Sequence, residues 1–150
     1  MNQYVIFTSN NQHFALNISE IDKIIEYEEP KLIPESESYF LGVIQYAQRV
    51  LPIIDLTTRL YNINLVRNTS NKIIVVMIEG TQLGLLVDDI IGIKTYESHQ
   101  IEESGRDINI PNQYIQGFIK TDDNITIVLH SSRLLSPAQK KEILSTAEIS

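Results

Sequence analysis

Three histidines are the first side chains to consider as metal ligands. His13, His99 and His130 lie far apart in the sequence, and the chain contains no cysteine. A zinc site would have to gather all three from separate elements, without the closely spaced Cys and His ligands of structural zinc sites. His13 precedes Phe14 in an alternating segment and is explained more simply as a surface or half-buried strand residue. We expect no metal site.

The residues of a hydrolytic triad are present in type but not in arrangement. Ser131 and Ser132 follow His130, yet neither serine has the G-x-S-x-G pattern that exposes a nucleophile on a strained turn. Asp88 and Asp89 end an apolar run, and successive side chains of a continuing strand point to opposite faces, so they form no carboxylate pair. The sequence therefore predicts a protein that is not an enzyme and that binds no cofactor.

The composition favours a folded cytoplasmic protein. The 150 residues are 43% apolar and carry a net charge of −7. Negative charge repels the phosphate backbone, so we do not expect nucleic acid as a partner. No apolar run reaches the about 20 residues that a membrane span needs, and the first residues lack the basic start and apolar core of a signal peptide. We expect a cytoplasmic location and no membrane insertion.

Short segments rich in Val, Ile and Tyr recur between polar turns, a pattern typical of β strands. The nearly regular spacing of the turns predicts an all-β barrel or sandwich. No linker divides the chain; the stretch His99–Gln113 is the longest predicted loop, and Val66–Asn71 is a predicted crossing between halves. The ten predicted strands are Tyr4–Phe7, His13–Leu16, Lys23–Tyr27, Gly42–Gln45, Val50–Leu56, Lys72–Ile78, Gln82–Val87, Ile90–Thr95, Ile115–Lys120 and Ile125–Leu129.

Helix is predicted in two places only. Asn17-Ile18-Ser19-Glu20 has an N-cap residue with a glutamate three positions later, which predicts a helical turn near residue 20. Ser136-Pro137-Ala138-Gln139 combines an N-cap, a proline at the first helical position and a glutamine that completes a capping box. The helix that follows is predicted to run to about Thr146, with Ile143, Leu144 and Ala147 packed inward.

Two parts of the chain resemble each other. Placing Tyr39–Ile44 over Tyr114–Ile119 aligns tyrosine with tyrosine and glycine with glycine. The match continues without a gap until Asp55 meets His130. This match predicts two small β units built alike, each of which needs the other to cover an apolar face.

One strand offers a surface for protein contact. Pro52 interrupts an apolar run, and proline within a strand is confined to edges and bulges because it has no N–H to donate. Tyr39, Phe40 and Tyr46 add large side chains near that edge, and tyrosine is enriched at protein interfaces. The same aromatic residues could instead cover the ends of a barrel.

On these residues the chain resembles the CheW family of bacterial chemotaxis coupling proteins. The typical family pattern is a glycine, two apolar residues, Asn-x-Arg-Gly and then apolar-Pro-apolar-apolar-Asp-Leu. Its two flanks are present without insertion as Gly42–Ile44 and Val50–Leu56. Further matches extend along nearly the whole chain: Phe7, Ile18-x-x-Ile21 with Ile24-Ile25, Leu32-x-Pro34, Gly84-Leu85-Leu86-Val87-Asp88 and Tyr114-Ile115-x-Gly117.

The resemblance implies both a fold and a role. The implied fold is all-β: two intertwined five-stranded SH3-like barrels with a shared core and a short C-terminal helix, within one CheW-like domain over residues 1–150. The implied role is a scaffold that ties the cytoplasmic tips of methyl-accepting chemoreceptors to the regulatory domain of the histidine kinase CheA. Such a scaffold binds no cofactor, catalyses nothing and works at receptor arrays on the inner face of the membrane.

The chain departs from the family pattern at the implied contact surface. Ala47 and Gln48 stand where the family has arginine and glycine, Lys23 where it has glutamate, and His130 where it has aspartate. The family uses the arginine turn and the nearby glutamate to contact receptor and kinase. The changes indicate either a partner whose contact residues have changed to match or relaxed selection on the contact. Lys23 and Arg49 could carry the two charges in exchanged places. The implied partner-binding residues are Ile21, Lys23, Ile25, Tyr46, Ala47, Gln48 and Arg49.

The missing glycine predicts a different turn. A residue with a Cβ costs roughly 1 kcal/mol or more at positive φ, so Tyr46–Arg49 is predicted to form a type I or wider turn with a displaced tip. Arg49 would then be the only cation there, and receptor coupling would be weaker while kinase binding survives.

Two functions stay open at this stage. The first is a CheW-type adaptor, in the form of a divergent paralogue that serves a specialised receptor or kinase. The second is a sensory β module that binds a small molecule at a barrel mouth lined by Tyr and Phe residues, without kinase contact.

Overall fold

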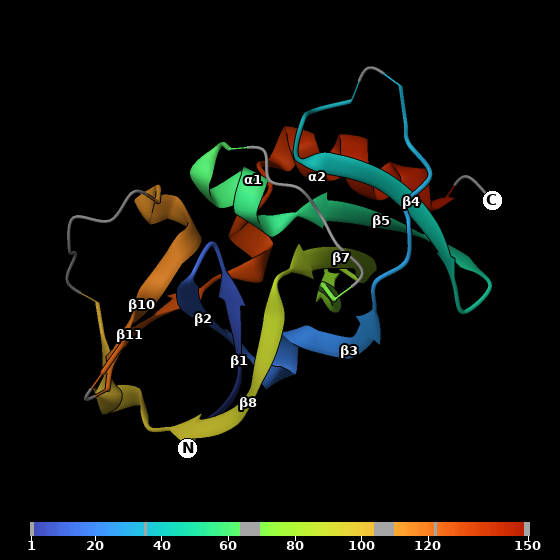
Figure 1. Ribbon diagram of the computed structural model, residues 1–150. Coiled ribbons are helices and arrows are strands. Elements are labelled where there is room, and N and C mark those ends of the chain that lie inside the picture. Colours follow the sequence, from blue (N-terminus) through green and yellow to red (C-terminus); the bar gives the residue numbers. More distant parts are fainter. Residues whose placement is uncertain (1, 35, 64–69, 104–109, 122, 149–150) are drawn as a thin grey trace.

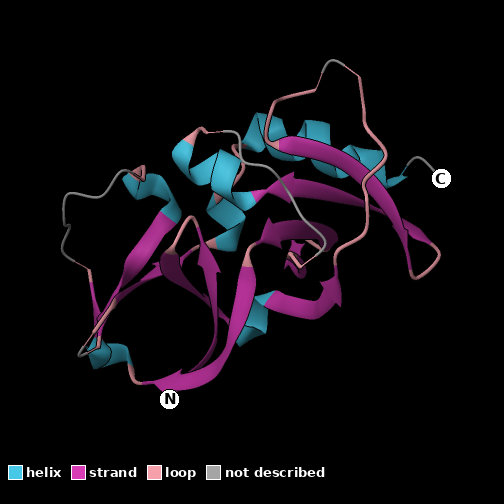
Figure 2. Cartoon of the chain, viewed as in Figure 1, coloured by secondary structure: helices cyan, strands magenta, loops and turns pink. Residues whose placement is uncertain are grey.

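Two curved β sheets make up most of the computed structural model, which describes residues 2–34, 36–63, 70–103, 110–121 and 123–148 (Figures 1 and 2). The first sheet has the order β8-β1-β2-β11-β10-β9 and the second the order β3-β6-β7-β5-β4. The strands are β1 (Asn2–Ser9), β2 (Gln12–Asn17), β3 (Ile21–Glu26), β4 (Phe40–Tyr46), β5 (Arg49–Asp55), β6 (Lys72–Ile78), β7 (Thr81–Val87), β8 (Asp89–Tyr96), β9 (Ile101–Glu102), β10 (Ile115–Lys120) and β11 (Ile125–Leu129).

Each of the ten predicted strands lies on a strand of the structure. Lys72–Ile78, Ile115–Lys120 and Ile125–Leu129 have the predicted bounds. The short strand β9 lies inside the predicted loop His99–Gln113, whose residues 104–109 are outside the described part of the chain. Two residues are too few to show the alternation that identifies a strand in a sequence. The predicted crossing at 66–71 falls mostly on residues that are not described.

The predicted internal match is confirmed by the register of two strand pairs. Gly42 of β4 pairs with Ile53 of β5, and Gly117 of β10 pairs with Val128 of β11. Both pairs contain a β-bulge directly before the glycine. The equivalence also holds for hydrogen bonds: the Asp55 N–H donates to the Tyr39 carbonyl oxygen at 2.8 Å, and the His130 N–H donates to that of Tyr114 at 3.0 Å.

The equivalence extends to strands that the sequence match does not include. The β1–β2 hairpin turns at Asn10 and Asn11, and the β6–β7 hairpin turns at Glu79 and Gly80, all four with positive φ. The next strands, β3 and β8, are edge strands of opposite sheets. The chain thus enters the second sheet between β2 and β3 and returns to the first between β7 and β8, which is why the two units are intertwined.

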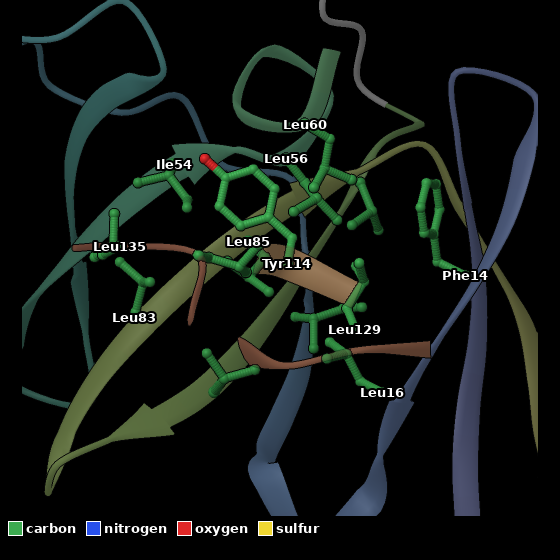
Figure 3. Close-up of a cluster of buried hydrophobic side chains, with 14 of the residues drawn as sticks. Phe14, Leu16, Ile54, Leu56, Leu60, Leu83, Leu85, Tyr114, Leu129 and Leu135 are labelled. Atoms are coloured by element: carbon green, nitrogen blue, oxygen red, sulfur yellow. The ribbon is translucent and has the colours of Figure 1, made fainter. Parts of the chain in front are cut away.

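Three clusters of buried apolar side chains stabilise the two sheets. The largest lies between the sheets, and Figure 3 shows Leu16 and Leu129 of the first sheet in one cluster with Ile54 and Leu85 of the second. Each sheet also curls around a smaller cluster of its own. The first contains Tyr4, Ile6, Ala15, Tyr96, Ile119 and Val128, and the second Leu41, Ile44, Leu51, Ile53, Ile73, Val75 and Leu86.

Both predicted helical segments are confirmed. The Asn17 side chain accepts a hydrogen bond from the Ser19 N–H at the start of a 3-10 turn, and Ser136 and Gln139 form the predicted capping box of α2 (Pro137–Leu144). Ile143 and Leu144 are buried as predicted, whereas the side chain of Ala147 is outside the described residues. The 3-10 helices are η1 (Ile18–Glu20), η2 (Ser98–Gln100), η3 (Asn112–Tyr114), η4 (Ser131–Arg133) and η5 (Ser145–Glu148).

The prediction that helix occurs in only two places is wrong. A further helix, α1 (Leu56–Tyr61), follows β5 directly, so Leu56 begins a helix instead of ending a strand. The Asp55 carboxylate accepts a hydrogen bond from the Thr58 N–H at 3.3 Å and caps this helix. Neighbouring threonines give a strand-like sequence, and a six-residue helix gains its stability from burial of its side chains more than from local propensity.

Candidate partner-binding site

The turn between β4 and β5 has a different shape from the one predicted. Ala47 and Gln48 have φ values of 50° and 64°, between the directly paired residues Tyr46 and Arg49. A two-residue connection with positive φ at both positions is a type I′ turn, so the prediction of a type I or wider turn is wrong. Such a turn matches the right-handed twist of its strands, and that match outweighs the local cost of two side chains at positive φ.

The same geometry recurs in the β1–β2 and β6–β7 hairpins with more suitable residues. Asn10 and Asn11 have φ values of 52° and 62°, and Glu79 and Gly80 have values of 52° and 81°. Asparagine and glycine tolerate the left-handed region better than alanine and glutamine do. The β4–β5 turn therefore keeps the shape of a glycine-containing turn while it carries local strain.

Arg49 lies at the base of this turn and is exposed. The side chains of Lys23 and Arg49, the two cations of the predicted site, form no hydrogen bond or ion pair with another described residue. Lys23 lies on β3 next to a bulge at Asp22 and is exposed as well. Both charges are thus available to a partner.

The apolar members of the predicted site divide between two clusters. Ile25 of β3 and Tyr46 of β4 are half-buried and pack against the same cluster inside the second sheet. Ile21, at the start of β3, packs against the cluster between the sheets. The structure therefore brings Ile25 and Tyr46 to one cluster and places Ile21 on another.

His130 differs from its counterpart Asp55 in the way that the following helix is capped. The side chain of His130 makes no capping hydrogen bond to η4. Oε1 of Glu20 takes that place and accepts hydrogen bonds from the Ser131 N–H at 3.2 Å and the Ser131 Oγ at 2.7 Å. Burial lowers the pKa of His130, and Arg133 lowers it further, while the Glu20 carboxylate acts in the opposite direction.

The other residues considered for chemistry serve local structure. His13 lies on β2 and His99 in η2, and among the described residues no group of three or more His, Asp or Glu side chains is placed to hold a metal ion. Asp88 Oδ2 accepts a hydrogen bond from the Asn10 N–H at 2.9 Å, and Asp89 Oδ1 one from the Ile90 N–H at 2.8 Å. Within the described chain, no helix combines the length and apolar character needed to cross a membrane.

Comparison with known proteins identifies the family. The family model of the CheW-like domain matches residues 3–139. The chain belongs to the CheW-like family. The chemotaxis protein CheW of Thermotoga maritima is 24% identical over 91% of this chain and 89% of its own length. The probable chemotaxis protein CheW of Rhizobium etli is 27% identical over 93% of this chain and 90% of its own.

A solved structure shares the fold. The scaffolding protein TtCheW from Thermoanaerobacter tengcongensis has a TM-score of 0.83 and 24% identity, and the match covers 90% of this chain and 88% of that one. The expected fold, two intertwined SH3-like barrels with a shared core and a short C-terminal helix, is thereby confirmed for this CheW-like chain. Strand β9 is a sixth, two-residue member of the first barrel.

Sequence reasoning missed several exposed apolar residues of this CheW-like protein. Ile24 on β3 and Ile93 on β8 are 37% and 58% exposed and hold equivalent places, each the second residue after the bulge of its edge strand. Ile91 is the extra residue of the bulge on β8 and is 49% exposed. The alternation of β3 and β8 predicts strands but does not tell which face meets solvent, because both faces carry isoleucine.

Proposed function

We propose that this CheW-like protein is a non-catalytic adaptor that couples chemoreceptor tips to the regulatory domain of the histidine kinase CheA. The observation that carries this proposal is the match of the CheW-like family model to residues 3–139, nearly the full chain. The adaptor would work in the cytoplasm, at receptor arrays on the inner face of the membrane.

The contact surface of the proposed adaptor consists of β3 and the β4–β5 turn. Its cations, Lys23 and Arg49, are exposed and without a partner in the described part of the chain. Ile21, Ile25 and Tyr46 are half-buried and present part of their apolar surface beside them. Exposed charge next to apolar surface suits a protein partner better than a small ligand. The turn residues Ala47 and Gln48 complete the proposed set.

The test measures two affinities by titration calorimetry. The purified protein is titrated with the CheA regulatory domain and, separately, with a receptor cytoplasmic fragment, both from the source organism of this chain. Binding of both supports the adaptor. Absence of binding to both, with a folded protein, overturns it.

Variants of the turn test the contact surface. Arg49→Ala should weaken receptor binding, because it removes the cation at the base of the turn. Ala47→Arg with Gln48→Gly should strengthen binding to receptors of the usual kind, since the type I′ turn already has the backbone shape that arginine and glycine would use. Kinase binding, spread over a larger surface, should survive both changes. If neither variant changes receptor binding, the turn is not the recognition element.

The packing does not favour the second hypothesis, a small-molecule module. Its binding site would need Tyr and Phe side chains at the mouth of a barrel. Phe7, Phe14, Phe40 and Phe118 are buried in the cluster between the sheets, as is Tyr39. These rings stabilise the fold and leave little aromatic surface for a ligand.

A further inference from the structure

A groove of about 190 Å³ lies between residues 28–31 and the β4–β5 hairpin. Its apolar lining comes from Val43, Ile44 and Val50. Glu28 and Glu29 line it as well, and both are exposed. Figure 1 shows the chain after β3 rising past β4, and Lys31 of this segment pairs with Val43 of β4.

The equivalent place in the first barrel is bridged by an ion pair. Glu102 of β9 pairs with Phe118 there, as Lys31 pairs with Val43 in the second barrel. Lys120 Nζ lies 3.4 Å from Glu102 Oε2 and bridges the strands. In the second barrel these two places are held by Gln45 and Lys31, which cannot form an ion pair. The second barrel therefore lacks the ion pair that joins these two places in the first barrel.

An exposed leucine follows Lys31, one of the residues that line the groove. Leu32 is 74% exposed, more than any other large apolar side chain of the described residues. The backbone directly before it is fixed, because the Lys31 N–H donates to the Val43 carbonyl at 2.8 Å and the Val43 N–H donates to that of Lys31 at 3.0 Å. Pro30 and Pro34 restrict the chain on either side. A backbone held in this way loses little conformational entropy on binding.

The charge of the rim decides between possible occupants. Glu28 and Glu29 form no ion pair within the described residues, and the Tyr27 hydroxyl donates to Glu29 Oε2 at 2.9 Å. Lys31 offsets one of these charges, so the rim stays negative. A second copy of the chain would bring the same carboxylates against each other, and like charges oppose such a contact.

We propose that this groove and Leu32 form a docking site for a protein segment that carries an apolar side chain next to a lysine or arginine. The apolar groups would pack on Leu32, Val43 and Val50, and the cation would meet Glu28 and Glu29. The proposal goes beyond the adaptor role and does not depend on it. A chain that binds neither kinase nor receptor can still bind such a segment.

The probe is a synthetic helical peptide of about 16 residues with leucines on one face and lysines on the other. Its counterpart has glutamate in place of lysine. Each is added to isotope-labelled protein and followed by two-dimensional NMR. The basic peptide should shift the signals of Leu32, Val43, Val50 and the glutamates, and the acidic peptide should not. The proposal is overturned if the signal shifts are spread over the whole surface or occur away from the groove. It is also overturned if both peptides cause the same shifts.

Two variants distinguish binding at the groove from general electrostatic attraction of the basic peptide to a negatively charged protein. Leu32→Ser should raise the Kd of the basic peptide by about tenfold, the effect expected for one exposed leucine contact. Lys31→Glu with Gln45→Lys should also weaken binding, because it places across the groove the kind of ion pair that bridges the equivalent place in the first barrel. This double change makes the net charge more negative, so general attraction predicts tighter binding instead.

Ile93→Ser is the matched control. Ile93 is 58% exposed on β8, in the other barrel, so its loss should leave the Kd unchanged. The NMR spectrum of each variant shows whether the fold is kept. If Leu32→Ser and the double variant keep the fold and bind the basic peptide as the unmodified protein does, the groove is not a docking site.

Discussion

Tyr39 and Tyr114 hold equivalent places in the two halves and face the same guanidinium group. The Cζ atom of Arg59 lies 4.4 Å from the ring centre of Tyr39 and 5.3 Å from that of Tyr114. Nε of Arg59 donates to the Leu134 carbonyl at 2.6 Å, and a terminal nitrogen donates to Gln139 Oε1 at 2.6 Å. One side chain from α1 thereby joins both halves to the C-terminal helix.

Replacing Arg59 should therefore destabilise the whole fold. Arg59→Met keeps a long apolar stem but removes two charge-assisted hydrogen bonds and two cation–π contacts, which together are worth about 2–4 kcal/mol. Urea unfolding measures the loss. Arg133→Met is the matched control, because Arg133 is exposed and its loss should change stability by less than about 0.5 kcal/mol. Equal effects of the two changes would contradict this role of Arg59.

For the strained β4–β5 turn, we predict that a substitution raises the stability of the fold. Ala47→Asn with Gln48→Gly should raise the free energy of unfolding by about 1–2 kcal/mol, because both new residues tolerate the φ values of 50° and 64° found there. The reverse exchange, Asn10→Ala with Asn11→Gln in the β1–β2 hairpin, should cost a similar amount. Urea unfolding of both double variants measures the changes. No gain from the first pair would mean that the turn is unstrained.

Close approach of the chain explains why Gly42 cannot be replaced. A Cβ at Gly42 would lie 2.1 Å from the Lys31 carbonyl oxygen, and φ there is +129°. Gly42→Ala should therefore cost more than about 2 kcal/mol and disturb the pairing of Lys31 with Val43. Gly80→Ala is the control: φ is +81° but nothing lies within 4 Å of the added Cβ, so about 1 kcal/mol is expected. Thermal unfolding of the two variants measures which one loses more stability. An equal loss of stability would refute the steric argument.

Much of the fold could be predicted because local signals agree with it. The alternating segments, the capping box at Ser136 and the paired Tyr and Gly positions each specify an element or a register. Helix α1 could not be predicted, because the two threonines after Leu56 favour a strand and only burial in the finished core makes them helical. Arg59 was missed because its partners, Tyr39, Tyr114, Leu134 and Gln139, lie far from it in the sequence.

The candidate site was less predictable than the fold. The residues of the β4–β5 turn could be read from the family pattern, but its backbone shape could not, because strand twist decided against local preference. Exposure of Leu32 likewise depends on the pairing of Lys31 with Val43, a contact without a sequence signal of its own. The partner-binding role of Ile21, Lys23, Ile25 and the turn stays a prediction.

His130 should make stability depend on pH. Its folded-state pKa lies below the usual value of about 6.5, so the unfolded chain binds a proton more readily and the free energy of unfolding falls as the pH drops through about 6.5. Replacing His130 by Gln should remove this part of the dependence, measured by urea unfolding between pH 5.5 and 7.5. His99→Gln, at an exposed histidine, tests whether the loss of any histidine has this effect. An unchanged pH profile in the His130 variant would contradict the assignment.

The cluster between the sheets predicts that residues 1–150 unfold as one unit. Leu16 of the first barrel and Leu85 of the second are both fully buried in that cluster, so neither barrel can open without exposing the apolar face of the other. Leu16→Ala should lower stability by about 2–5 kcal/mol while the transition stays single. Circular dichroism and tyrosine fluorescence, followed along one urea titration, measure whether their midpoints coincide. Two separate unfolding transitions would show that the barrels are independent domains, and so would a variant in which the midpoint of only one signal changes. If the midpoints of both signals change together, the shared core couples the barrels.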